Sequence, residues 1–279
     1  MPARPRWDAG CCRGSPARVS GASRTPTNRQ GAPEVSEENL VLVEDRGAVR
    51  ILTMNRPDKL NALNTALTQA LLGALLAADA ESGTGAVVLA GAGRGFCAGA
   101  DLSEFKHLTP AQSGVVEARA DLTCRLQAAM QAMGKPVVSA VQGAAVGGGA
   151  GLAIGCDMVV ASTSMKFGYP ELRHAIVPAL VMTSLVRALG RKQAFEMISL
   201  GRLIGAEEAL GLGLVNRVVE GDPLPVALEI AEIWSAYEPR AMRAAKSLFY
   251  RVQDLPTEAA MLVGRDMNAL MRSFRESGV

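Results

Sequence analysis

The sequence predicts an α/β protein, because short apolar strands alternate with helical stretches along most of its 279 residues. Ala86–Ala90 is a short continuous apolar run, as strands of a parallel sheet covered on both faces are, and Val137–Val141 is expected to be a second buried strand. Hydrophobic residues make up 49% of the chain but aromatic residues only 4%, so the core is expected to consist of closely packed Ala, Leu, Val and Gly.

The expected elements follow from local signals in chain order. Leu40–Glu44 and Val49–Thr53 flank Asp45-Arg46-Gly47, a turn signal typical of a hairpin. Asn64 is a candidate N-cap for an apolar-periodic helix that ends before Gly83. The later expected elements are strand Ala86–Ala90, a helix over Pro110–Met133, strand Val137–Val141, a helix after a glycine-rich turn, and strand Met158–Ala161. We expect a core domain over residues 35–220 and a helical region over residues 221–279.

The first 34 residues differ from the rest in composition. They hold six Arg and no Lys beside Asp8 and Glu34, together with five Pro and four Gly. Because no apolar period is present, we expect residues 1–34 to form a disordered N-terminal extension. An Arg-rich transit peptide is one explanation, although its prolines interrupt an amphipathic helix; an early start codon is the other, which we favour.

Charge and cysteine content exclude several classes of protein. The 245 residues after position 34 carry 23 basic and 25 acidic residues, so they present no electrostatic footprint for nucleic acid. No long uncharged apolar stretch predicts a membrane span. Five cysteines without a spacing pattern and only two histidines argue against a metal site and fit a reducing, cytoplasmic location.

Three segments could carry chemistry, and two of them are glycine-rich turns after an apolar strand. The segments are Gly91–Asp101, Gln142–Gly151 and Lys166–Glu171. No Gly-Lys-Ser/Thr follows either turn, which excludes a P-loop, and only the loose form of a dinucleotide-binding turn is matched. The glycines then have two interpretations. They either expose backbone N–H groups that hold a developing oxyanion, or let a helix pack closely on the sheet.

Residues 40–276 resemble the enoyl-CoA hydratase/isomerase family, also called the crotonase family, in five ordered motifs. The motifs are Asn55–Leu63, Phe96–Leu102, Lys135–Gly143 running into Gly147–Gly149, Phe167–Glu171 and Ala209–Asn216. Because they occur in order over most of the chain, the resemblance is far more specific than any single glycine motif.

The resemblance implies a crotonase-like spiral of ββα units with a C-terminal helical region that builds trimers or hexamers. It implies an acyl-CoA thioester as substrate, with coenzyme A as part of the substrate and no separate cofactor. By position, the N–H groups of Ala100 and Gly148 form the oxyanion hole, and Glu171 is the acid/base. The residues implied to line the coenzyme A and thioester site are Lys59, Ala62, Leu63, Ala98, Asp101 and Leu102.

One position departs from the family pattern. Hydratases of the family carry a second glutamate where this chain has Gly151, so one of two carboxylates is missing. A dehalogenase branch also has Gly there, but has Trp and Asp where this chain has Glu171 and Ala179. A single carboxylate favours isomerisation of 3-enoyl-CoA to 2-enoyl-CoA. Hydration of a 2-enoyl-CoA is the alternative, and a non-catalytic acyl-CoA-binding protein is the alternative from another class.

Overall fold

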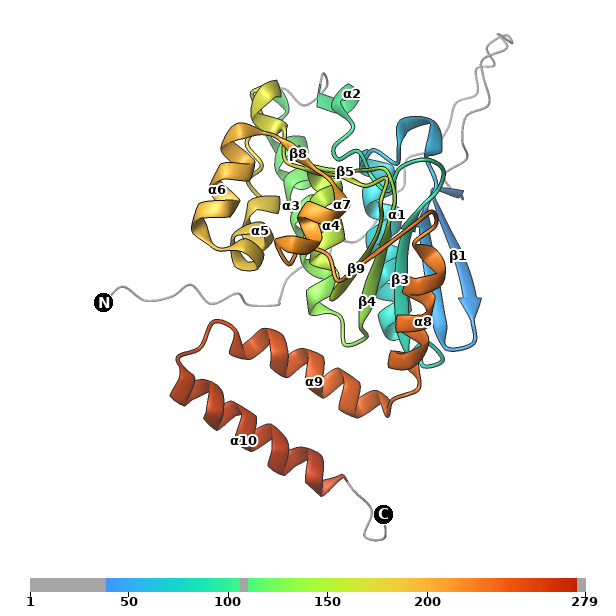
Figure 1. Cartoon of the computed structure of the whole chain (residues 1–279), viewed down its shortest axis with the longest axis vertical. Helices are drawn as coiled ribbons and strands as arrows, with labels where there is room; N and C mark the ends of the chain where they lie inside the picture. Colours follow the sequence, from blue (N-terminus) through green and yellow to red (C-terminus); the bar gives the residue numbers. More distant parts are fainter. Residues whose placement is uncertain (1–38, 106–109, 275–279) are drawn as a thin grey trace, which may run out of the picture. The chain divides into compact units, whose positions relative to one another are not determined.

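The structure is a computed structural model in which residues 39–105 and 110–274 are described (Figure 1). The first elements in chain order are β1 (Val41–Arg46), β2 (Val49–Met54), η2 (Pro57–Lys59), α1 (Thr65–Ala80), β3 (Ala86–Gly91), α2 (Leu102–Phe105), η3 (Pro110–Gln112) and α3 (Ser113–Ala132). The next are β4 (Val137–Val141), β5 (Ala144–Val146), α4 (Gly148–Gly155), β6 (Met158–Ser162), β7 (Lys166–Gly168), η4 (Glu171–His174), α5 (Val181–Leu189) and α6 (Arg191–Leu200). The last are β8 (Leu203–Ile204), α7 (Ala206–Gly211), β9 (Arg217–Val219), α8 (Leu224–Ser235), α9 (Pro239–Val252) and α10 (Thr257–Ser273).

The predicted α/β class is confirmed by a six-stranded sheet in the order β1-β2-β3-β4-β6-β9. β1 and β2 form the expected antiparallel hairpin, and Gly47 in its turn has φ +58°. The remaining neighbours, from β2 to β9, pair in parallel. The crossovers between these parallel strands contain α1, α3 and α4, which cover one face of the sheet.

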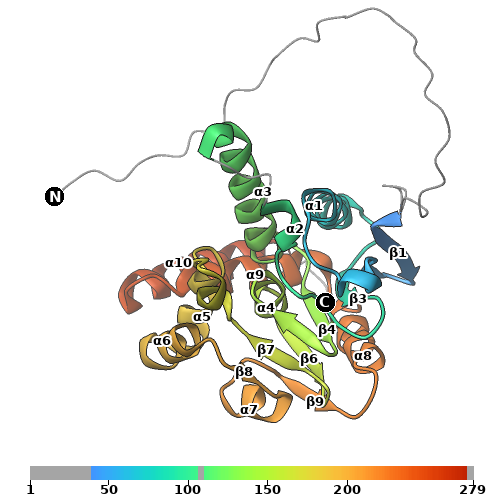
Figure 2. The same cartoon turned by 90° about the horizontal axis from the view of Figure 1, so that it is seen from above.

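The strands β2, β3, β4 and β6 of the main sheet are buried on both faces because their residues alternate between two apolar clusters. Val87 and Leu89 of β3 face the larger cluster, which includes the inner sides of α1, α3 and α4. Val88 on the same strand faces a smaller cluster under α8. The views in Figures 1 and 2 show α8 on the opposite side of the sheet from α1 and α3. This two-sided burial explains why β3 is a continuous apolar run and why β4 is apolar except for Ser139.

A second, three-stranded sheet, in the order β5-β7-β8, was not predicted from the sequence. β5 and β7 pair in parallel, with Ala145 opposite Phe167, and β8 is antiparallel to β7. The chain passes from β4 in the first sheet to β5 in the second, through α4, and back to β6 in the first. The glycine-rich turn expected after β4 therefore contains a short strand before its helix begins.

The described chain after β9 consists of α8, α9 and α10. Lys246 of α9 is buried and donates to the carbonyls of Met130 and Lys135 and to Asp157 Oδ2, at 2.6, 2.8 and 2.7 Å. Among the described helices, none has both the length and the apolar character needed to cross a lipid bilayer. The expected extension over residues 1–34 lies outside the described residues.

Candidate functional site

Backbone pairing brings the two glycine-rich turns side by side. Cys97 N–H donates to Ala144 O at 2.8 Å, and Val146 N–H donates back to Cys97 O at 3.0 Å. This pairing places Gly99 so close to β5 that a Cβ on it would lie 2.6 Å from Val146 O. Gly99 also has φ +89°, so both its conformation and its surroundings require glycine.

The two expected oxyanion donors converge at this junction. A Cβ on Gly99 would lie 3.3 Å from Gly148 N, and a Cβ on Gly148 would lie 3.9 Å from Ala100 N. Gly148 is the first residue of α4, and the N–H groups of a helix's first turn have no intrahelical acceptor. The structure thus brings Ala100 and Gly148 together from segments 48 positions apart in the sequence.

The N–H of Ala100 takes no part in the backbone pairing between its own segment and Leu63. Leu63 N–H donates to Gly99 O at 2.7 Å, and Asp101 N–H donates to Leu63 O at 3.1 Å. A parallel bridge of this kind uses the carbonyl of Gly99 and the N–H of Asp101, on either side of Ala100, and leaves the N–H of Ala100 itself out of the pairing. Among the residues that the structure describes, no backbone carbonyl accepts from the N–H of Ala100 or Gly148. Within the described chain, both N–H groups are therefore left to donate to a ligand.

Glu171 is the carboxylate beside these donors. It follows Pro170 and opens η4, directly after β7. The β5–β7 register continues with Gly147 N–H donating to Gly168 O at 2.8 Å, and a Cβ on Gly147 would lie 2.8 Å from Glu171 Oε1. Burial raises the pKa of the Glu171 carboxyl above its ordinary value. Glu171 Oε2 is buried without a hydrogen-bond partner within the described part of the chain.

Two other titratable side chains near the site are kept neutral by burial. Tyr169 is fully buried, and burial together with the nearby Glu171 raises the pKa of its hydroxyl well above the ordinary value. Cys97 donates its thiol hydrogen to Asn61 O at 3.1 Å, and burial raises its pKa to about 12. A thiol with so high a pKa is not a nucleophile at neutral pH. Glu171 is then the ionisable group best suited to proton transfer.

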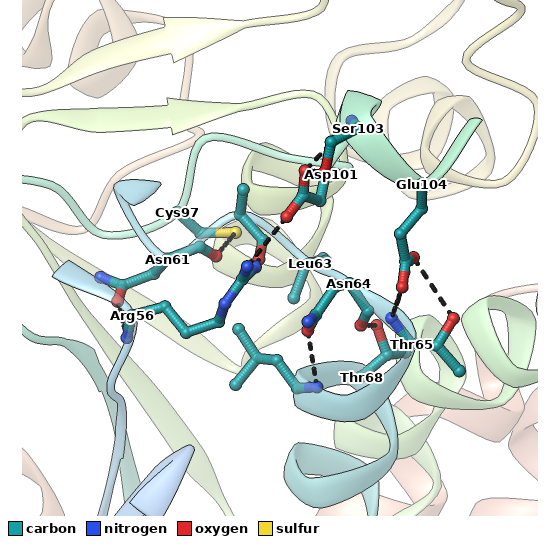
Figure 3. Close-up of polar contacts among 12 residues, drawn as sticks. Arg56, Asn61, Leu63, Asn64, Thr65, Thr68, Cys97, Asp101, Ser103 and Glu104 are labelled. Atoms are coloured by element: carbon teal, nitrogen blue, oxygen red, sulfur yellow. Dashed lines mark hydrogen bonds and ion pairs between the residues drawn. The ribbon is translucent and has the colours of Figure 1, made fainter. Parts of the chain in front are cut away.

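The segments implied to line the coenzyme A site also lie together (Figure 3). Ala98 N–H donates to Leu60 O at 2.9 Å, which places Ala98 and Asp101 beside the segment of Lys59, Ala62 and Leu63. Lys59 and Leu102 are exposed, Ala62 and Ala98 are half-buried, and Leu63 is buried. Within residues 39–105 and 110–274, no three His, Cys, Asp or Glu side chains gather in a way that could hold a metal ion.

Two polar residues that the sequence did not single out hold these segments together. Arg56 forms an ion pair with Asp101 at 2.9 Å, so the Asp101 carboxylate has a structural partner (Figure 3). Asn61 is fully buried with φ +54°, and its Nδ2 donates to the carbonyls of Ala92, Gly95 and Phe96. Asn tolerates positive φ better than most residues, which is the local signal that could have identified it.

Comparisons with known proteins agree with this architecture. Residues 44–274 match the family model described as enoyl-CoA hydratase/isomerase. The 2,3-dehydroadipyl-CoA hydratase of Escherichia coli is 35% identical, covering 85% of this chain and 91% of that protein. The short-chain-enoyl-CoA hydratase of Clostridium acetobutylicum is 36% identical, covering 81% of this chain and 86% of that protein.

Solved structures show the same fold. An enoyl-CoA hydratase of Mycobacterium smegmatis aligns with a TM-score of 0.78 at 34% identity, over 84% of this chain and 91% of that chain. An enoyl-CoA hydratase of Bacillus anthracis aligns with a TM-score of 0.76 at 30% identity, over 83% and 90% of the two chains. The fold is the crotonase spiral that the sequence resemblance implied. The chain belongs to the enoyl-CoA hydratase/isomerase family, whose members act on acyl-CoA thioesters.

Proposed function

We propose that this enzyme isomerises 3-enoyl-CoA thioesters to 2-enoyl-CoA thioesters, using the N–H groups of Ala100 and Gly148 as an oxyanion hole and Glu171 as its one acid/base. The convergence of both N–H groups beside a buried carboxylate supports the oxyanion and acid/base roles. Backbone donors aimed at a thioester oxygen stabilise the enolate that forms when an α proton is removed, by about 3–4 kcal/mol for each donor.

The reaction needs one group that removes a proton and returns it. The Glu171 carboxylate takes a proton from C2, and the electrons of that C–H bond move toward the thioester carbonyl, whose oxygen becomes the oxyanion. As the carbonyl re-forms, the enolate electrons make the C2=C3 double bond and the C3=C4 electrons take the proton from Glu171 at C4. The substrate and product have the same atoms, and Glu171 ends as a carboxylate.

The observation that carries the isomerase assignment is at Gly151, where no carboxylate is present and no space is left for one. A Cβ there would lie 2.6 Å from Gln127 Oε1 and 2.7 Å from Val181 Cγ1. The site therefore offers one base at the family's two carboxylate positions.

Hydration of a 2-enoyl-CoA is the second candidate, because the relatives described above are named hydratases. The two reactions are separated by assaying the purified chain with one acyl length as its 3-enoyl-CoA and its 2-enoyl-CoA thioester. Isomerisation creates the absorbance of the conjugated thioester, whereas hydration removes it and adds the mass of water. We expect the 3-enoyl substrate to react faster. Hydration at a typical enzyme rate of about 10 s⁻¹ with poor isomerisation would overturn the proposal.

Binding without turnover of either thioester would instead support a non-catalytic acyl-CoA-binding protein. In the catalytic case we propose that coenzyme A is held by the segments of Lys59–Leu63 and Ala98–Leu102, with no other cofactor. We also propose a cytoplasmic location, in keeping with the free thiols of Cys97, Cys124 and Cys156.

We propose a homotrimer or homohexamer that associates through the last helices. Phe249 of α9 is 59% exposed in the single chain, and Met261 and Leu270 of α10 are 70% and 51% exposed. Apolar side chains gathered at this density on two helices are typical of an interface. Light scattering coupled to size-exclusion chromatography measures the assembly, and a monomer at micromolar concentration would contradict it.

A further inference from the structure

Gln127 is a buried polar side chain on α3 that neither the family motifs nor the proposed reaction uses. Its Nε2 donates to Gly148 O at 3.0 Å, and the residue is 9% exposed. Its other end, Oε1, lies where a side chain at Gly151 would begin, since a Cβ there would be 2.6 Å away. The carboxamide therefore lies across the first turn of α4 and touches the residue that carries one oxyanion donor.

The packing of α3 on α4 explains why Gln127 reaches this far. Gly151 and Gly155 are four residues apart and so lie on one face of α4. A Cβ on Gly155 would lie 2.9 Å from Met130 Cε and 3.7 Å from Gln127 O. Two absent side chains let α3 approach closely, and the carboxamide of Gln127 fills the resulting space. Position 151 lies within α4, and the space beside it is filled by Gln127 and Val181.

Gly148 needs an external anchor because glycine has the greatest backbone freedom of any residue. On its N-terminal side, Gly147 N–H is bonded to Gly168 O at 2.8 Å. On its C-terminal side, Gly148 O accepts from Gln127. The peptide groups on both sides of the donor are thus tied to other elements, β7 on one side and α3 on the other.

We propose that Gln127 is a positioning residue of the oxyanion hole, which holds Gly148 in register and occupies with a neutral carboxamide the place of the family's second glutamate. This inference rests on the proposed function, in which Gly148 N–H is an oxyanion donor. A carboxamide suits the place because it donates to a carbonyl, which an ionised carboxylate cannot do. It also adds no second charge that would perturb the ionisation of Glu171.

The test is Gln127→Met, which keeps the length of the side chain and removes the donor. A misplacement of catalytic groups of about 1 Å costs about 10²-fold in rate, so we expect kcat to fall roughly 10- to 100-fold with KM within roughly threefold. Affinity for acetoacetyl-CoA, a thioester that readily forms an enolate, should fall with kcat.

The matched control is Ser139→Ala. Ser139 is also buried and donates from its Oγ to a carbonyl of the same helix, Ala153 O at 3.1 Å, but nearer the other end of α4. The loss of this hydrogen bond, worth about 1 kcal/mol, should lower Tm. Because the bond does not involve Gly148, kcat should stay within about twofold of the native value. Should Gln127→Met fail to fold, Gln127→Glu at alkaline pH removes the same donor in the same shape.

Equal kcat in folded Gln127→Met and Ser139→Ala would overturn the inference. The faster of the two enoyl-CoA reactions is used as the assay, so the result does not depend on which one the native enzyme prefers. If Gly148→Pro and Ala100→Pro abolish turnover while Gln127→Met does not, the oxyanion hole stands and only the role of Gln127 fails. If the proline variants stay active, the proposed oxyanion hole itself is contradicted, and with it the proposed function on which the role of Gln127 rests.

Discussion

The carboxylate of Glu171 lies against the backbone of Gly147, so closely that a Cβ on the glycine would be 2.8 Å from Oε1 and 3.3 Å from the carboxyl carbon. Gly147 is also the N-cap of α4, and the next residue carries the Gly148 N–H. One backbone unit therefore fixes the carboxylate proposed as the base and the N–H proposed as an oxyanion donor relative to each other. Without a side chain at position 147, the carboxylate can approach the place where a thioester oxygen would be held.

Gly147→Ala should disable the enzyme more than it destabilises it. The new methyl group has to displace the Glu171 carboxylate, and φ +55° adds backbone strain. We expect kcat to fall by about 10²-fold, as for a misplaced catalytic group. Gly190→Ala is the control, because Gly190 has φ +73° with nothing within 4 Å of its Cβ position. Similar losses of kcat in the two variants would show that strain alone, and not contact with Glu171, is responsible.

Glu171→Gln should remove proton transfer while preserving shape. General acid–base catalysis is worth about 10² to 10⁴ in rate, and kcat should fall by at least the lower figure. Because burial raises the pKa of Glu171, the acid limb of the native kcat/KM profile should lie above the ordinary glutamate value of about 4.3. Steady-state kinetics over a pH series measure both the kcat of the variant and the acid limb of the native profile. An acid limb at or below the ordinary value would exclude Glu171 as the base.

The same variant should be more stable than the native protein at neutral pH. The raised pKa means that the folded state binds the Glu171 proton more tightly than the unfolded chain does. Stability is therefore lost as the pH rises from the unfolded pKa through the folded one. Glutamine carries no charge, so Tm of the variant minus Tm of the native protein should increase across that window and level off above it. A Tm difference that stays constant with pH would show that the carboxyl of Glu171 is not shifted by the fold.

Much of the fold could be predicted because its signals are local. Asn64 caps α1 as expected, accepting from Leu67 N–H at 2.9 Å, and strand β4 has the predicted bounds Val137–Val141. The second sheet could not be predicted, since β5, β7 and β8 have only two or three residues each and carry no apolar period. Their pairing joins segments far apart in the chain, which no local pattern encodes.

Some residues of the candidate site could likewise be predicted from the sequence, and others could not. The glycine-rich turns and Glu171 were identified from sequence motifs, and the structure brings them together. The Arg56–Asp101 pair joins residues 45 positions apart, so no local pattern in the sequence encodes it. The burial of Gln127 could not be predicted from the sequence for a related reason. A polar residue within a helix is normally exposed, and only the absence of a side chain at Gly151 lets it be buried.

Lys246→Met should destabilise the fold without touching the chemistry. Lys246 is buried in its ion pair with Asp157 at 2.7 Å, and Tyr250 Oη donates to the other carboxylate oxygen at 2.8 Å. Breaking a buried ion pair by removing one partner costs about 3–5 kcal/mol, so Tm should fall by on the order of 10 °C. Arg265→Met, which removes an exposed pair with Asp266, is the control and should shift Tm by less than about 2 °C. Equal shifts would mean that α9 is not fixed through Lys246.

The oxyanion hole is tested by removing one N–H at a time with proline. Gly148 is the first residue of α4, where proline is favoured and no helical hydrogen bond is lost, so Gly148→Pro should fold. Ala100→Pro removes an N–H that the pairing with Leu63 does not use. We expect each variant to lose about 10²- to 10³-fold in kcat, the usual cost of one oxyanion donor.

The controls are Gly148→Ala and Ala100→Ser, which keep the N–H. The alanine methyl group would meet Leu63 Cδ1 at 3.3 Å, a side-chain end that can move. Circular dichroism and Tm report folding. A folded proline variant with the kcat of its control would show that its N–H does not stabilise the transition state.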